Sequence, residues 1–142
     1  MLYFDSSYVV RLYLSDPGWH EVRTLAAANK VACSIHGRAE VIAAFHRKFR
    51  EGTITHSQFS AAFQQFEADS KFQAFAWLSF SETVLAALAK VFSQLPATVH
   101  LRAADAMHLA SAKENAFKEI FSNDKQLLKA AGYFGLMPRN VF

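Results

Sequence analysis

The chain has 142 residues, of which 52% are hydrophobic, and 15 Lys and Arg residues against 12 Asp and Glu residues give a formal net charge of +3 at pH 7. A chain of this length and apolar content can bury one substantial core, so we expect a single globular domain over residues 1–142. No segment approaches the roughly 18 uninterrupted apolar residues of a membrane span, so no transmembrane helix is expected. The mild positive charge permits a nucleic-acid partner but does not require one.

The N-terminus and the cysteine content both indicate a cytoplasmic protein. Residues 1–5 have no basic region, long apolar segment or small-residue cleavage site, so they do not resemble a secretory signal. Cys33 is the single cysteine and cannot form an internal disulfide, which fits a reducing compartment.

Short apolar runs alternate with segments of helical spacing along the whole chain. The first half predicts a strand over 2–4, helices over 8–14 and 19–29, a strand over 31–35, and helices over 38–51 and 56–75. The second half predicts a strand over 76–80, helices over 83–95 and 102–116, a strand over 119–122, a helix over 124–131 and a last strand near residue 137. Parallel strands need crossover connections, which are usually helical. We therefore predict a three-layer α/β/α fold with a short central parallel sheet of four or five strands.

Four carboxylates stand at positions that such a fold would bring together. Asp5 directly follows the first predicted strand, Asp124 follows the fourth, and Glu40 lies one turn into the helix after the second. Ligands of open parallel sheets bind beyond the carboxyl ends of the strands. Asp105 lies in a helix of small and apolar residues, where an ionised carboxylate is costly unless it has a partner.

Each of the first three carboxylates also has a purely structural interpretation. Asp5 and Asp124 are equally well explained as helix N-caps. Glu40, taken alone, is better explained as a solvated glutamate of a first helical turn, since it falls on the face opposite Ile42 and Phe45. Asp105 has no comparable local explanation.

Carboxylates that converge repel one another, and a hard divalent cation is the simplest means of keeping them ionised. Oxygen ligands favour Mg2+ or Mn2+, whereas zinc is expected to recruit His or Cys at regular spacing, and no such motif is found. An ion held in this way can activate water and orient a phosphodiester for attack.

These residues resemble the acidic motifs of the PIN-domain family. Residues 2–7, Leu-Tyr-Phe-Asp-Ser-Ser, are similar to the opening of PIN domains, and Ala39-Glu40-Val41 to their second acidic position. Residues 102–110 resemble the third position and residues 122–127 the fourth, so the resemblance covers essentially the whole chain. Within the family, the compact length is similar to VapC toxins of bacterial and archaeal toxin–antitoxin pairs.

The resemblance implies a Mg2+-dependent endoribonuclease that acts as the toxin of a type II pair and hydrolyses RNA phosphodiesters with metal-activated water. It implies Asp5, Glu40, Asp105 and Asp124 as catalytic metal ligands. It also implies a homodimer and a cognate antitoxin, with Ser6 and Ser122 as supporting polar residues. The alternatives are a catalytically inactive PIN-fold module that binds RNA or protein, and a purely structural helical interaction protein.

Two less specific patterns predict further surfaces. Arg47, Lys48 and Arg50 could contact RNA phosphates, or could form a solvated basic helix face. An aromatic stripe on the two helices over 38–75 predicts a protein interface, formed by Phe45, Phe49, Phe59, Phe63 and Phe66. His36 and His108 are read as packing or hydrogen-bonding residues and receive no catalytic role.

Overall fold

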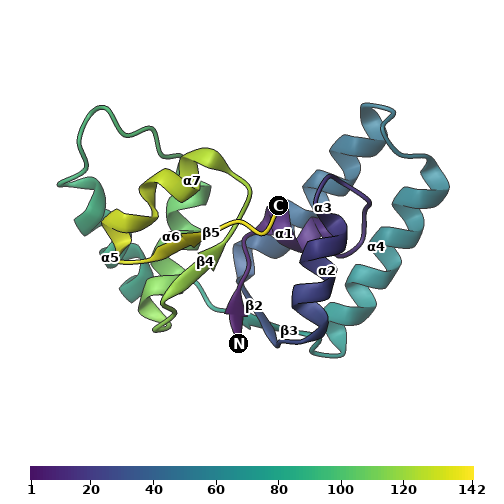
Figure 1. The fold of residues 1–142 in the computed structure, drawn as a ribbon, viewed down its shortest axis with the longest axis horizontal. Helices are drawn as coiled ribbons and strands as arrows, with labels where there is room; N and C mark the ends of the chain where they lie inside the picture. Colours follow the sequence, from purple (N-terminus) through teal and green to yellow (C-terminus); the bar gives the residue numbers. More distant parts are fainter.

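The computed structural model describes all residues 1–142, and Figure 1 shows short strands between two groups of helices. In chain order the elements are β1 (Leu2–Tyr3), α1 (Ser6–Arg11), α2 (Trp19–Ala27), β2 (Val31–Ser34), α3 (Ile35–Arg50), α4 (His56–Lys71), β3 (Phe75–Leu78), α5 (Glu82–Phe92), α6 (Ala103–Glu114), β4 (Glu119–Phe121), α7 (Lys125–Ala130), the 3-10 helix η1 (Ala131–Phe134) and β5 (Met137–Arg139). The predicted strands and helices are all present, with shifted boundaries. No helix combines the length and apolar character needed to cross a membrane.

All strand pairs are parallel, which confirms the predicted α/β class. The strands form a three-stranded sheet in the order β1-β2-β3 and a two-stranded sheet of β4 and β5. The two sheets meet where Phe4 bridges Phe121 and the Asp5 N–H donates to the Phe121 carbonyl oxygen at 3.0 Å. The sequence predicts a single sheet, whereas the structure has two sheets that are linked only at this bridge. The pairing does not continue because the chain turns away at Asp5, which already caps α1.

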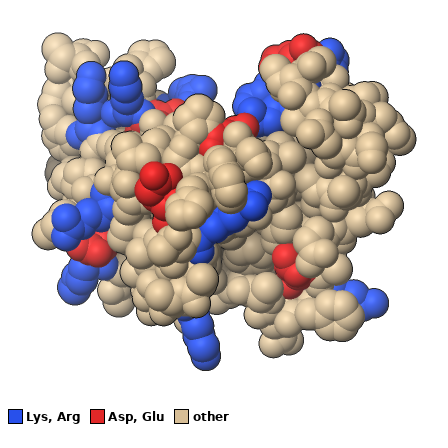
Figure 2. All heavy atoms as spheres, turned by 45° about the vertical axis from the view of Figure 1, so that its right-hand side comes forward, with Lys and Arg blue, Asp and Glu red and all other residues tan.

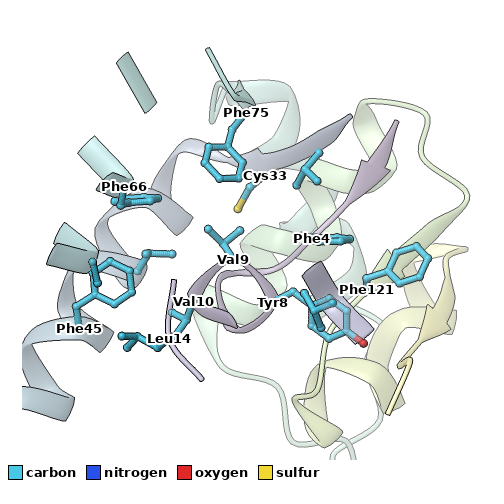
Figure 3. Close-up of a cluster of buried hydrophobic side chains, with 14 residues drawn as sticks. Phe4, Tyr8, Val9, Val10, Leu14, Cys33, Phe45, Phe66, Phe75 and Phe121 are labelled. Atoms are coloured by element: carbon cyan, nitrogen blue, oxygen red, sulfur yellow. The ribbon is translucent and has the colours of Figure 1, made fainter. Parts of the chain in front are cut away.

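Successive side chains of a strand point to opposite faces, and helices pack on both of these faces. Phe4 and Cys33 belong to a core that also contains Val9 of α1 and Phe66 of α4 (Figure 3). Tyr3 points to the other face and joins a second core with residues of α5, α6 and α7. Two cores on opposite sides of the strands confirm the three-layer α/β/α architecture.

The hairpin of α3 and α4 corrects the predicted interface. Phe45 and Phe66 are completely buried and pack edge to face, with ring centroids 5.8 Å apart, so these two side chains belong to the core. Tyr13 packs edge to face against both rings. Phe49 and Phe59 are only partly buried and stack on each other at 5.5 Å. The surface part of the stripe is therefore reduced to Phe49, Phe59 and Phe63.

Helix α3 begins at Ile35 and not at residue 38, which brings its first turn against α6. Gly37 makes this approach feasible, since a Cβ there would lie 2.6 Å from the Cys33 Sγ and 2.9 Å from the His108 Cε1. A helix interior normally disfavours glycine. At this position the absent side chain allows His36 and Glu40 to face the start of α6.

Candidate active site

The four predicted carboxylates line one cavity of about 420 Å³ at the ends of the strands. Asp5 follows β1, Glu40 lies on α3, Asp105 on α6, and Asp124 immediately precedes α7. Segments far apart in the sequence thus contribute to a single site. Basic and acidic side chains together border the hollow at the upper edge of the molecule in Figure 2.

Asp5 is buried and accepts three hydrogen bonds, two at Oδ1 and one at Oδ2. Its Oδ1 accepts from the Ser7 hydroxyl at 2.7 Å and from the Tyr8 N–H at 3.0 Å, and its Oδ2 accepts from the Ser122 hydroxyl. Burial raises the pKa of Asp5, and the nearby His108 together with these donors opposes part of the rise. The carboxylate is therefore both a helix cap and an anion held at a cost, and a cation in the cavity would reduce that cost.

Asp105 and Asp124 share one guanidinium group. Arg102 donates from Nε to the Asp105 Oδ2 and from Nη2 to the Asp124 Oδ2, each at 3.0 Å. Burial raises the pKa of Asp105, Arg102 opposes this rise, and the charge of Asp124 adds to it. The Arg102 side chain is 66% exposed, so these ion pairs are weak and a divalent cation can replace them.

Two histidines lie close to the Glu40 carboxylate. The His108 Nε2 donates to the Glu40 Oε2 at 2.8 Å, and the His36 Nε2 lies 3.8 Å from the same oxygen. Burial alone would raise the pKa of Glu40, but the His108 hydrogen bond and the charges of both histidines outweigh it, and the pKa is lowered. Burial and the neighbouring His108 lower the pKa of His36 to about 4. Glu40 is consequently a partnered anion and not a freely solvated glutamate.

The spacing of these groups means that a divalent cation in the cavity would need water among its ligands. No three of the four carboxylates bring oxygen atoms within 4.8 Å of one another, and the group that meets this distance is His36, Glu40 and His108. Mg2+ usually binds one or two carboxylates and keeps several waters, so it does not need a closed protein cage. The oxygen donors, the crowded negative charge and the raised pKa values of Asp5 and Asp105 all favour such an ion.

The basic residues around the cavity differ from the predicted set. Arg47 and Lys48 line it, but the Lys48 Nζ is paired with the Asp16 Oδ1 at 2.8 Å. Arg50 does not line the cavity and lies 3.9 Å from Glu51, so it is not part of this site. Arg11, which was not predicted, lines the cavity and donates from Nη1 to the Asn123 Oδ1 at 3.2 Å.

Sequence reasoning also missed Ser7 and Arg102. Ser6 lines the cavity and contributes to the lowered pKa of Glu40, while Ser7 donates directly to Asp5. The spacing of Arg102 and Asp105 could have revealed their contact, because residues i and i+3 neighbour each other on a helix. No local signal indicates Arg11, which is 6% exposed because α1 packs beside α2 and the Asn123 loop.

Comparison with known proteins identifies the fold and the family. The family model for the PIN domain matches residues 2–133. FitAcB from Neisseria gonorrhoeae has a TM-score of 0.76 at 18% identity, over 99% of this chain and 97% of its own. VapC20 from Mycobacterium tuberculosis, described as a sarcin-ricin loop cleaving toxin, has a TM-score of 0.64 at 17% identity, over 97% of this chain and 100% of its own.

A toxin–antitoxin complex from Klebsiella pneumoniae contains a chain with a TM-score of 0.63 at 18% identity, over 96% of each chain. No curated protein sequence matches. At these identities the solved structures establish the fold, and the family model spans nearly the whole sequence. The chain therefore belongs to the PIN-domain family.

Proposed function

We propose that this chain is a Mg2+-dependent endoribonuclease that acts in the cytoplasm as the toxin of a type II toxin–antitoxin pair. One observation supports the proposal above all others: Asp5, Glu40, Asp105 and Asp124, from four separate segments, line a single cavity. Burial without a structural need is rare for carboxylates, and Asp105 in particular has only an exposed arginine as its partner.

Asp5, Glu40, Asp105 and Asp124 would hold Mg2+, and the same oxygen donors would accept Mn2+. When bound, the ion supplies a Lewis acid for the phosphodiester and lowers the pKa of water. Ser7 and Ser122 hold both oxygens of Asp5 in fixed positions. His108 keeps Glu40 anionic, and Arg11 and Arg47 place positive charge along the cavity wall for RNA phosphates.

The toxin role and the partners are inferred from the relatives and from the surface. One solved relative is a toxin–antitoxin complex, and another is described as a sarcin-ricin loop cleaving toxin. Phe49, Phe59 and Phe63 remain partly exposed on the α3–α4 hairpin. We propose that this surface takes part in antitoxin binding or in a homodimer.

Cleavage of a structured RNA by the purified chain tests the activity. We expect Mg2+-dependent products, none with EDTA, and restored cleavage when Mg2+ or Mn2+ is added back. Loss of a residue that hydrogen-bonds to a metal ligand typically lowers metal affinity or activity by about 10- to 100-fold. Asp105 is itself a proposed ligand, so Asp105→Asn should reduce the cleavage rate by more than this. Glu21→Gln, an exposed acid of α2 outside the cavity, is the matched control and should retain the parent rate.

The same experiment separates the nuclease from an inactive binding module. RNA binding that survives EDTA, with no products from any variant or metal, would favour the binding module. Cleavage by Asp105→Asn at the parent rate would show that the activity belongs to a contaminant or to another site.

A further inference from the structure

His36, Glu40 and His108 form a compact group beside the acidic cavity. The His108 Nε2 lies 2.8 Å and the His36 Nε2 3.8 Å from the Glu40 Oε2, and all three atoms lie within 4.8 Å of one another. The two imidazole rings lie 4.2 Å apart between centroids. This is the one group in the structure where three metal-ligating side chains come so close together.

Both histidines are oriented through their second ring nitrogen. The His36 Nδ1 is 2.8 Å from the Ser34 Oγ, and the His108 Nδ1 is 3.0 Å from the Tyr3 Oη. Tyr3 is itself fixed, since it is completely buried and accepts from the Ser34 N–H at 3.2 Å. Histidines that bind metal usually hold a polar partner at the other nitrogen, which fixes the ring and leaves Nε2 directed at the ion.

The distances suit a tetrahedral ion. Bonds of 2.0–2.1 Å to Zn2+ place neighbouring ligand atoms about 3.3 Å apart. The observed separations of 2.8 Å and 3.8 Å from the Glu40 oxygen lie on either side of this value. For an ion to bind, the Nε2 of His36 gives up its 3.1 Å hydrogen bond to the Ala104 carbonyl oxygen, and the Nε2 of His108 gives up its bond to Glu40. Each imidazole then carries its proton on Nδ1, where the Ser34 or Tyr3 oxygen can accept it.

We propose that His36, Glu40 and His108 bind a divalent transition-metal ion, Zn2+ first among them, and that this ion withdraws Glu40 from the acidic cavity and thereby inhibits the nuclease. Two imidazoles and one carboxylate are a common zinc ligand set, and the open fourth position is left for water. The site differs from the proposed Mg2+ site in its nitrogen ligands, and the two sites share only Glu40. The inhibition rests on the proposed function, whereas the binding does not.

Calorimetric titration of the full chain with Zn2+ tests the binding without RNA. We expect one Zn2+ per chain, and at least tenfold weaker binding for His36→Gln. His100→Gln, which removes an exposed histidine outside the group, is the matched control and should bind as the parent does. A thermal unfolding curve for each variant shows that it is folded, and the visible spectrum with Co2+ reports the geometry, since tetrahedral nitrogen ligation gives intense bands and octahedral oxygen ligation weak ones.

Inhibition is measured separately, as RNA cleavage in excess Mg2+ with increasing Zn2+. The parent should lose activity over the Zn2+ range in which it binds the ion, and His36→Gln should require at least tenfold more Zn2+. Absence of saturable binding, or equal binding by His36→Gln, would overturn the site. Binding without inhibition would overturn the withdrawal of Glu40. If no variant cleaved RNA under any condition, the nuclease proposal would fail while the calorimetry still decided the zinc site.

Discussion

Arg102 reaches Asp124 across the mouth of the cavity, with its Nη2 3.0 Å from the Asp124 Oδ2, and the Nε of the same guanidinium is 3.0 Å from Asp105. One exposed cation thus balances two of the four carboxylates. An arriving Mg2+ would compete with it for the same oxygens, because each oxygen that Arg102 contacts is also a candidate ligand.

Arg102→Gln should therefore bind Mg2+ more tightly than the parent. Two exposed ion pairs contribute about 0.2–1 kcal/mol each, so we expect roughly a 2- to 30-fold lower Mg2+ dissociation constant. Titration calorimetry without RNA measures it. Arg47→Gln changes the charge of the same cavity without breaking an ion pair to these carboxylates, and a greater effect of that variant would show that general charge and not competition controls the affinity.

Asp5→Asn should abolish RNA cleavage and yet leave the fold at least as stable as the parent in the absence of Mg2+. The amide oxygen can still accept from the Tyr8 N–H and the amide nitrogen can donate to Ser122, while the buried charge is removed. Thermal unfolding and a cleavage assay on the same preparation measure the two effects. A clear loss of stability would mean that the ionised carboxylate is needed for the cap.

The stability difference between the parent and Asp5→Asn should depend on pH. The pKa of Asp5 is raised in the folded chain, and the unfolded value is about 3.9, so over that interval the folded state retains a proton that the unfolded state has lost. The parent therefore loses stability relative to the variant as the pH rises from about 3.9 through the folded pKa. Melting curves from acidic to neutral pH should diverge in that direction, and a constant difference would contradict the shift.

Gly37→Ala should destabilise the chain and disturb Glu40. The added Cβ would lie 2.6 Å from the Cys33 Sγ and 2.9 Å from the His108 Cε1, inside a packed layer. Overpacking of this kind costs about 1–3 kcal/mol. Gly132→Ala is the matched control, since a Cβ there meets nothing within 4 Å, and equal free energies of unfolding for both variants would argue against the close approach of α3 and α6.

Phe45→Ala and Phe49→Ala should differ in their effect on stability, because one residue lies in the core and the other at the surface of the same helix. Phe45 is completely buried, so its truncation should cost about 3–5 kcal/mol of unfolding free energy. Phe49 is partly exposed and stacks on Phe59, so we expect a loss of about 1 kcal/mol together with weaker self-association or antitoxin binding. Chemical denaturation measures the first effect and analytical ultracentrifugation the second, and the reverse order of stabilities would contradict the assignment.

Local signals in the sequence determined the strand–helix alternation and three of the four carboxylate positions. Asp5 and Asp124 could be placed because a residue at the end of a short apolar run that also caps a helix lies at the strand ends of any parallel α/β sheet. Both are indeed N-caps, with side chains that accept from the following helix, and both also line the cavity, so the cap does not exclude a role in the proposed site. Asp105 could be placed because its apolar neighbours leave an ionised group without local partners.

The surroundings of those carboxylates were decided by tertiary packing alone. Glu40 and His108 are 68 residues apart, and their contact depends on the approach of α3 to α6 at Gly37. Periodicity likewise predicts one aromatic stripe on the α3–α4 hairpin, but it cannot tell that Tyr13 closes over Phe45 and leaves Phe49 at the surface. Caps and periodicity depend on neighbours within one or two turns, whereas burial and pairing depend on which distant segment occupies the space beside them.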